Sequence, residues 1–240
     1  MDMKTASDWQ NERPALLTAL REFAGLLKNR PFQNSEGVRG VSAFALYWFI
    51  KQINPTVIFE VGVWKGFSTW IIEQAAPVAE VYCFDPILPI EYYLDEKKLG
   101  PTYRSPRAHY SGQDFSCAGI EGITRGQPRP LVFFDDHQNK WPRLLQSKAV
   151  GIKDILFDDN TPECYTHQTL EHDRRDPELV QALDREIRSY EIFPALWPVD
   201  FSRGPMHIKE DGIGFPVERD LQLVYEERQW HSYLTYVRLR

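Results

Sequence analysis

The chain has 240 residues, of which 42% are hydrophobic and 26% are charged, a composition typical of globular domains. Its formal net charge of −6 argues against a nucleic-acid partner, because phosphate binding needs a basic surface. No segment offers the roughly 20 consecutive apolar residues that cross a bilayer, so we expect no membrane partner either.

Two helices are predicted before the first strand. Apolar residues recur at helical spacing from Leu16 to Leu27, and Asp8 could cap this helix. A second helix is expected from Val38 to Ile53, ending before Pro55. Residues 1–54 therefore form an N-terminal helical extension, which could cap a site or serve as the dimer face of a homo-oligomer.

Strand-like apolar runs follow at intervals of about 24 to 26 residues, with helix-compatible segments between most of them, which is the rhythm of βαβ units. The segment Ile90–Gly100 is irregular and is interpreted as an insertion. The predicted strands are Val57–Val61, Val81–Phe84, Arg107–Tyr110, Leu131–Phe134 and Ile155–Phe157.

The character of the sequence changes after Asn160. Asp176-Pro177-Glu178 begins a helix, whose expected apolar face runs from Leu179 to Tyr190. Residues 191–219 are rich in proline and glycine and are interpreted as a lid-like insertion. Its aromatic residues could line a pocket or pack the segment onto the domain; they are Phe193, Trp197, Phe201 and Phe215.

The last two runs, Leu221–Tyr225 and Tyr233–Leu239, alternate and predict an antiparallel pair at the sheet edge. The fold class is therefore α/β: a Rossmann-like, seven-stranded, mostly parallel sheet with a C-terminal antiparallel strand pair. Helices are expected on both faces, and residues 55–240 form one domain.

The stretch Thr56–Thr69 (TVIFEVGVWKGFST) is the most informative part of the chain. A buried strand leads into a turn with Gly62 and Gly66, and a helix follows. Glycines allow a tight turn and a close approach of a ligand to the backbone, and a helix N-terminus presents free N–H groups. A dinucleotide site would favour G-x-G-x-x-G, but the position two residues before Gly62 is Glu60.

The pattern E-x-G-x-x-x-G resembles motif I of class I S-adenosylmethionine-dependent methyltransferases, whose sheet has the expected strand count and order. The resemblance implies that the glycine turn passes the methionine part of the cofactor and that the acid anchors its amino group, directly or through water. It implies cofactor contacts from Glu60, Gly62, Trp64, Gly66, Ser68, Asp85, Asp114 and Asp136.

Two further acids follow strands. Asp85 ends the second strand, about 25 residues after the first loop, where a carboxylate can accept hydrogen bonds from two ribose hydroxyls. The alternative is that Asp85 is only a helix cap or a turn residue. Asp114 follows the third strand, where the corresponding segment of these methyltransferases bounds the adenine pocket. It could equally be the N-cap of the next helix.

The fourth and fifth strands end in Asp135-Asp136-His137 and Asp158-Asp159-Asn160. Both ends lie at the carboxyl edge of a parallel sheet, where converging carboxylate and amide oxygens would suit Mg²⁺. Because the acids are doubled, either member of each pair could be a ligand. Helix caps and turn residues without a metal are the alternative.

These strand ends resemble those of metal-dependent catechol-type O-methyltransferases. They also resemble the related bacterial family that methylates sugars and natural products and includes enzymes once labelled cephalosporin hydroxylases. The resemblance implies Asp136, Asp159 and Asn160 as metal ligands. The catechol-type lysine base lies three residues after the first metal Asp, where this chain has Asn139, and Lys140 is one residue further on.

Three candidates for catalysis follow from these positions: Lys140, His137 and His167. His137 could orient the site, whereas His167 could be a base for an acceptor hydroxyl, since a histidine pKa lies near neutral pH. His167 and His172 are expected on one helix, and His207 lies in the lid. His109 and His231 are given no role.

The sequence therefore predicts an enzyme that transfers a methyl group from S-adenosylmethionine to a hydroxyl of a small molecule, a sugar or natural product, with the assistance of a divalent cation. An NAD-linked oxidoreductase on a similar sheet and a non-catalytic S-adenosylmethionine-binding protein are the alternatives. Three scattered cysteines and an N-terminus without an apolar signal region favour a cytoplasmic location.

Overall fold

The computed structural model describes residues 1–32, 37–87, 103–162, 167–200, 209–228 and 231–240. The predicted insertion Ile90–Gly100 and the residues Cys164, Phe201 and His207 lie outside these residues.

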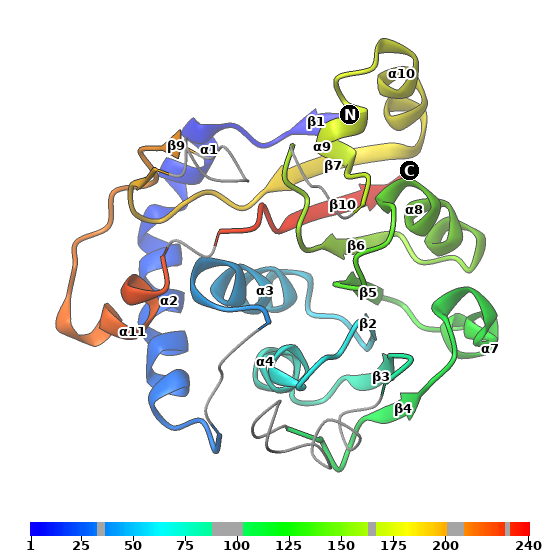
Figure 1. Ribbon diagram of the computed structural model, residues 1–240, viewed down its shortest axis with the longest axis horizontal. Helices are drawn as coiled ribbons and strands as arrows, with labels where there is room; N and C mark the ends of the chain where they lie inside the picture. The colour runs from blue at the N-terminus through cyan, green and yellow to red at the C-terminus, as the bar shows by residue number, and fades with distance from the viewer. Residues whose placement is uncertain (33–36, 88–102, 163–166, 201–208, 229–230) are drawn as a thin grey trace.

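One large sheet crosses the molecule diagonally in Figure 1. Its eight strands have the order β1-β7-β10-β6-β5-β2-β3-β4. The strands are β1 (Asp2–Met3), β2 (Val57–Val61), β3 (Glu80–Phe84), β4 (His109–Ser111), β5 (Pro130–Phe134), β6 (Asp154–Phe157), β7 (Ile187–Ile192) and β10 (Thr235–Leu239).

The pairing confirms the Rossmann-like class. Strand β2 pairs in parallel with β3 and β5, β3 with β4, and β5 with β6. Strand β10 runs antiparallel between β6 and β7. Strand β1 adds to β7 in parallel, so the sheet has one strand more than the sequence predicted.

Within the described ranges, no helix combines the length and hydropathy that crossing a bilayer requires.

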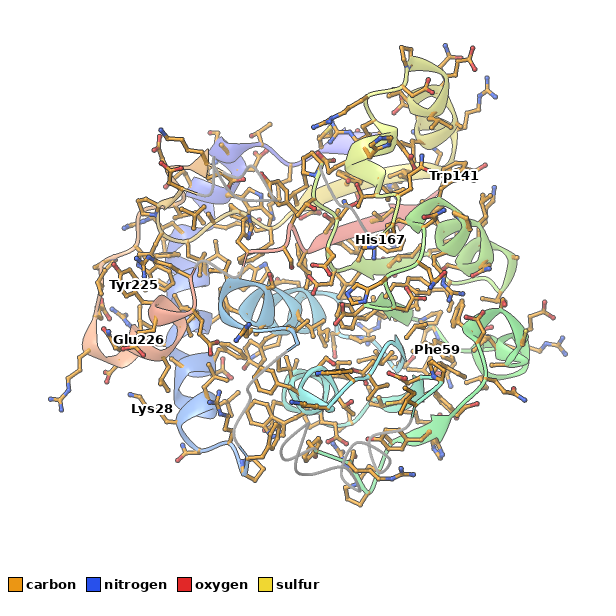
Figure 2. The ribbon with its side chains drawn as sticks, in the orientation of Figure 1. Lys28, Phe59, Trp141, His167, Tyr225 and Glu226 are labelled. Atoms are coloured by element: carbon orange, nitrogen blue, oxygen red, sulfur yellow. The ribbon has the colours of Figure 1, made fainter. Side chains whose placement is uncertain are left out.

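Helices cover both faces of the sheet (Figure 1). Helices α3 (Gly40–Ile53) and α4 (Phe67–Ala75) lie on one side, with α1 (Ala6–Asn11) and α2 (Arg13–Lys28) beyond α3. Helices α7 (Ile120–Thr124), α8 (Lys140–Ala149) and α10 (Pro177–Glu186) lie on the other. Strand alternation divides the core accordingly: Ile58 packs with the first group, whereas Phe59 packs with the second (Figure 2).

The predicted closing pair of strands is wrong in its first member. Leu221–Tyr225 belongs to a 3₁₀ turn, η2 (Arg219–Leu221), and to helix α11 (Gln222–Glu226). Leu221 and Val224 are buried, three residues apart, so this segment packs at helical spacing against α2 and α3. The other strand of the closing antiparallel pair is β7. It forms because the helix that begins at Pro177 ends at Glu186 and does not reach Tyr190.

The N-terminal helix also differs from expectation. Thr5 caps α1, and Asp8 is the third residue of that helix, where its carboxylate accepts a hydrogen bond from the Thr5 backbone N–H. A second helix, α2, then carries the buried Leu16-to-Leu27 face.

The apolar residues Phe193, Trp197 and Phe215 of the segment 191–219 are packed into the core. Phe193 is fully buried and meets Trp9, Phe44 and Phe49 edge-on. Trp197 and Phe215 are buried beside each other. A short hairpin of β8 (Val199–Asp200) and β9 (Lys209–Glu210) completes the segment. Of the two interpretations of its aromatic residues, packing onto the domain holds for these three.

Phe193→Ala tests this packing. We expect the variant to lose about 3–5 kcal/mol of the free energy of unfolding, the usual cost of a large cavity in a core, measured by urea denaturation. Val217→Ala, at a half-exposed site of the same segment, should change stability by less than about 0.5 kcal/mol. Equal, small effects would indicate that the segment lies loosely on the domain.

Candidate functional site

A cavity of about 740 Å³ opens at the carboxyl edge of the sheet. It lies where β2 and its neighbours β3 and β5 end, between the N-terminus of α3 and the segment before β10. The predicted residues on its wall are Gly62, Trp64, Asp85, Asp114, Asp136, His137 and Asp159. Residues that line it but were not predicted include Arg39, Ser42, Phe84, Gln113, Phe115, Arg143, His231 and Ser232.

The glycine turn is fixed by the chain's own close approaches. Gly62 and Gly66 have φ angles of 89° and 83°, in the left-handed region that favours glycine. A Cβ at Gly62 would lie 2.3 Å from the Asp135 carbonyl oxygen, and one at Gly66 would lie 2.0 Å from the Tyr103 carbonyl oxygen. Gly62 lies on the cavity wall, whereas Gly66 begins α4.

Asp85 holds this turn in place. Its Oδ2 accepts hydrogen bonds from the backbone N–H groups of Val63 and Trp64 at 2.8 and 3.0 Å, and its Oδ1 accepts one from Ile87 at 2.8 Å. Trp64 has a φ of 49°, which is unusual for a bulky residue, and its side chain is 38% exposed at the cavity. The turn thus presents an aromatic face and a carboxylate together.

Glu60 lies beneath the turn rather than on the described cavity wall. Its Oε2 accepts hydrogen bonds from the Thr69 hydroxyl at 2.6 Å and the Cys83 thiol at 3.1 Å. Burial raises the pKa of the Glu60 carboxyl to about 7. Ser68 is buried in α4, next to Thr69. Glu60 and Ser68, both predicted to contact the cofactor, therefore lie in the layer that supports the turn.

Arg143, which was not among the predicted site residues, pairs with two predicted acids. Its guanidinium donates to both carboxylate oxygens of Asp114, at 2.6 and 3.1 Å, and to Oδ2 of Asp136 at 2.8 Å. Arg143 holds the pKa of Asp114 well below its usual range. Asp114 also caps the turn η1 (Phe115–Cys117), as the alternative interpretation expected. A helix beginning at Lys140 would have placed Arg143, one turn later, near this sheet edge.

The side chains that converge beyond β5 and β6 are Asp135, His137 and Asp159, whose ligand atoms lie within 4.8 Å of one another. His137 Nε2 is 3.2 Å from Asp159 Oδ2. Both residues have positive φ angles, 53° and 49°. Non-glycine residues rarely adopt this conformation, and such residues concentrate at functional sites. We call these three residues the acid–histidine cluster.

Asn160 and Asp136, predicted as ligands, are held by other groups. The Asn160 amide donates to the Tyr190 hydroxyl at 2.6 Å and to Thr235 Oγ1 at 3.0 Å, and its oxygen accepts from the Leu170 N–H at 2.9 Å. It therefore ties β6 to β7, β10 and helix α9 (Leu170–Asp173). Within the described residues, Asp159 is the one predicted ligand in the acid–histidine cluster.

The buried acids alter one another's protonation. Burial and the charges of Asp158 and Asp159 raise the pKa of Asp135 well above its ordinary value. Burial and Asp159 raise the pKa of Asp158 to about 7. The pKa of Asp159 is lowered in spite of its burial, because His137 donates a hydrogen bond to it, and the same bond raises the pKa of His137.

Lys140 and His167 lie beside this cluster. Lys140 is fully buried at the start of α8, and its Nζ has no hydrogen-bond partner within the described part of the chain. His167 precedes α9 rather than lying on it (Figure 2), and its ring is 5.9 Å from that of His137. Burial and the charge of Lys140 lower the pKa of His167 to about 4. The three predicted catalytic residues are thus brought together.

Comparisons with known proteins give similarity to solved structures alone. No family model matches the chain, and no curated protein does. A putative O-methyltransferase from Klebsiella pneumoniae is 13% identical, with 95% of this chain and 90% of that chain covered and a TM-score of 0.48. An O-methyltransferase from Bacillus cereus in complex with SAH is 12% identical, with 94% and 91% covered and a TM-score of 0.46. The O-methyltransferase TomG from Streptomyces achromogenes, involved in tomaymycin synthesis and in complex with SAM, is 13% identical, with 94% and 89% covered and a TM-score of 0.46.

The raised pKa of Glu60 predicts a pH-dependent stability. The folded pKa of about 7 lies above the ordinary value of 4.5, so the unfolded chain loses this proton first and stability falls as pH rises from about 4.5 to about 7. In Glu60→Gln the free energy of unfolding should therefore fall by about 3 kcal/mol less over this pH range than it does in the wild type. Urea denaturation at pH 4.5 and pH 8 measures the difference.

Glu80→Gln, at the exposed start of β3, is the matched control and should leave the slope unchanged. An unaltered pH dependence in Glu60→Gln would show that this carboxyl is already ionised in the folded protein.

Proposed function

We propose that this chain is an S-adenosylmethionine-dependent O-methyltransferase that acts on a hydroxyl of a small molecule. The observation that carries the proposal is one cavity whose wall holds Gly62 and Trp64 of the glycine turn together with Asp85 and the acid–histidine cluster. Its 740 Å³ lies within the roughly 300–1,000 Å³ usual for small-molecule sites, and its place at the carboxyl ends of parallel strands is where open α/β sheets bind ligands.

The residues present fit the nucleoside part of the cofactor. A carboxylate has about four lone-pair sites, and Asp85 uses three for backbone N–H groups, so it retains capacity for a ribose hydroxyl. Phe84 and Phe115 offer apolar surface for a base, and Gln113 lies beside them on the wall. Asp114 is already paired with Arg143, so in this proposal it shapes the pocket and does not itself hydrogen-bond to the adenine base.

The turn would hold the methionine end. Gly62 brings bare backbone to the wall, and Trp64 adds its exposed ring. Glu60 supports the turn from beneath through Thr69. The bound cofactor supplies an electrophilic methyl group on a sulfonium, and the chain supplies alignment and electrostatics.

A divalent cation fits the acid–histidine cluster, with Asp135, His137 and Asp159 as candidate ligands. Two carboxylates suit a hard cation such as Mg²⁺, which otherwise keeps water ligands, whereas an imidazole ligand is also compatible with transition metals. When bound, such a cation would coordinate the acceptor oxygen and lower its pKa. Lys140 contributes a buried positive charge beside the same acids.

Cofactor binding is tested by calorimetric titration with S-adenosylhomocysteine. We expect one site per chain, weakened at least about tenfold by Asp85→Ala, since a hydrogen bond to a charged group contributes about 1.5–3 kcal/mol. Asp220→Ala is the control, because Asp220 is an exposed acid of η2 that pairs with Lys28 of α2. Gly62 is unsuitable for this purpose, because a side chain there meets the Asp135 backbone and would test folding.

Failure of S-adenosylhomocysteine to bind the wild-type chain, with NADH fluorescence enhanced instead, would favour an oxidoreductase and overturn the proposal. Binding of the cofactor without transfer to any acceptor would favour a binding protein.

Metal binding has its own prediction. Wild-type protein should bind Mn²⁺, used as a paramagnetic probe of the cation site, and Asp159→Asn should weaken binding at least about tenfold by removing a charged ligand. Electron paramagnetic resonance titration of free Mn²⁺ measures it. Asp136→Asn is a demanding control, since Asp136 pairs with Arg143 and lies outside the acid–histidine cluster. Equal losses in both variants would contradict the assigned ligand set.

A further inference from the structure

His231, for which no role was predicted, lies on the wall of the same cavity. It precedes β10 and shares the wall with Ser42 of α3 and with Ser232. The two serine hydroxyls are 2.7 Å apart, and Ser232 Oγ donates to Asp158. These contacts fix the segment that carries His231 against α3 and against the end of β6.

The imidazole is buried with an unsatisfied nitrogen. The residue is 2% exposed, and its Nε2 has no hydrogen-bond partner in the described part of the chain. The facing acid is Glu210 of β9, whose Oε2 lies 3.8 Å from Nε2, too far for a hydrogen bond. The ring stacks on Tyr233, with centroids 5.0 Å apart. An unpaired buried polar group costs about 1–3 kcal/mol, which calls for an explanation.

Burial favours the neutral form of this imidazole. Burial lowers the pKa of His231, opposed by the charge of Glu210. Tyr233 is the titratable group on its own segment, and Arg39 and Asp158 share its cavity wall. A neutral imidazole carries one donor and one acceptor nitrogen, so it can receive a proton.

We propose that His231, whose Nε2 faces Glu210, binds the acceptor hydroxyl through its other ring nitrogen, Nδ1, and takes its proton there during methyl transfer. This inference rests on the proposed function. In the step, the acceptor oxygen forms a bond to the methyl carbon while the carbon–sulfur bond breaks and leaves its electron pair on sulfur. The hydroxyl proton moves to the imidazole, which returns it to water. The Glu210 carboxylate stabilises the imidazolium, as a carboxylate partner does for other catalytic histidines.

The test compares His231→Asn, Glu210→Gln and the control His109→Asn, an exposed histidine on β4 that stacks on Tyr82. Each is titrated with S-adenosylhomocysteine and assayed for transfer of a labelled methyl group to 3,4-dihydroxybenzoate and to methyl α-D-glucopyranoside between pH 5.5 and 9. We expect His231→Asn to bind S-adenosylhomocysteine as the wild type does and to lose transfer at least about 100-fold, together with the acidic limb of the pH profile.

Glu210→Gln should keep cofactor affinity and shift that acidic limb to lower pH, because the imidazolium loses its anionic partner. A His231→Asn variant that binds S-adenosylhomocysteine and transfers methyl at the wild-type rate would overturn the inference while leaving the proposed function intact. Absence of S-adenosylhomocysteine binding in the wild type would instead defeat the proposed function.

If the wild type methylates neither probe, ¹⁵N resonances of the histidine rings decide, assigned from the His231→Asn spectrum. A neutral His231 ring at pH 7 whose nitrogen shifts on addition of either probe, with His109 unmoved, supports the inference. A protonated ring, or one that neither probe perturbs, overturns it.

Discussion

The constraint on which this site depends is the concentration of negative charge at the carboxyl edge of β5 and β6. Asp135, Asp136, Asp158 and Asp159 leave adjacent strands together, with Asp158 buried and the other three half-buried, and carboxylates withdrawn from water are costly unless they are paired. The chain offsets them separately. Arg143 pairs with Asp136, His137 with Asp159, and the Lys140 ammonium is buried near the others. Asp135 and Asp158 are left with raised pKa values, so this edge favours any further cation.

The second constraint is the contact between two loops. Because the Asp135 carbonyl oxygen occupies the place of a Gly62 side chain, the turn after β2 and the end of β5 touch through bare backbone. Asp85 adds three backbone hydrogen bonds to the same turn from β3. Glycine is therefore required by the protein's own packing. A glycine motif of this kind indicates a tight turn first and a ligand only when an open cavity lies against it.

The sequence located the parallel strands because each is a short apolar run bounded by turn residues or acids, a local signal. It misplaced the sheet edge because Leu221, Leu223 and Tyr225 alternate as in a strand, whereas Leu221 and Val224, the residues that are buried, have helical spacing. Contacts with α2 and α3 decided between the two patterns. The candidate site, too, was predictable only where the signal is local in the sequence. The strand ends and the acids were predictable, but Arg143, Tyr190 and Thr235 determine which acid or amide is engaged elsewhere. Tyr190 and Thr235 are distant in sequence from Asn160, whereas Arg143 is near Asp136 in sequence and reaches it because α8 begins at Lys140.

Asp135 links the two halves of the site. Its backbone N–H donates to Val61 at 2.8 Å and its carbonyl lies against Gly62, while its carboxylate belongs to the acid–histidine cluster. A cation drawn to that carboxylate would act on the residue whose backbone forms the floor of the glycine turn. If both proposed ligands bind, binding at the two places would be coupled, and by thermodynamic linkage each ligand would change the affinity of the other by the same factor. Two adjoining sites that share one residue in this way favour a reaction in which both ligands are present at once.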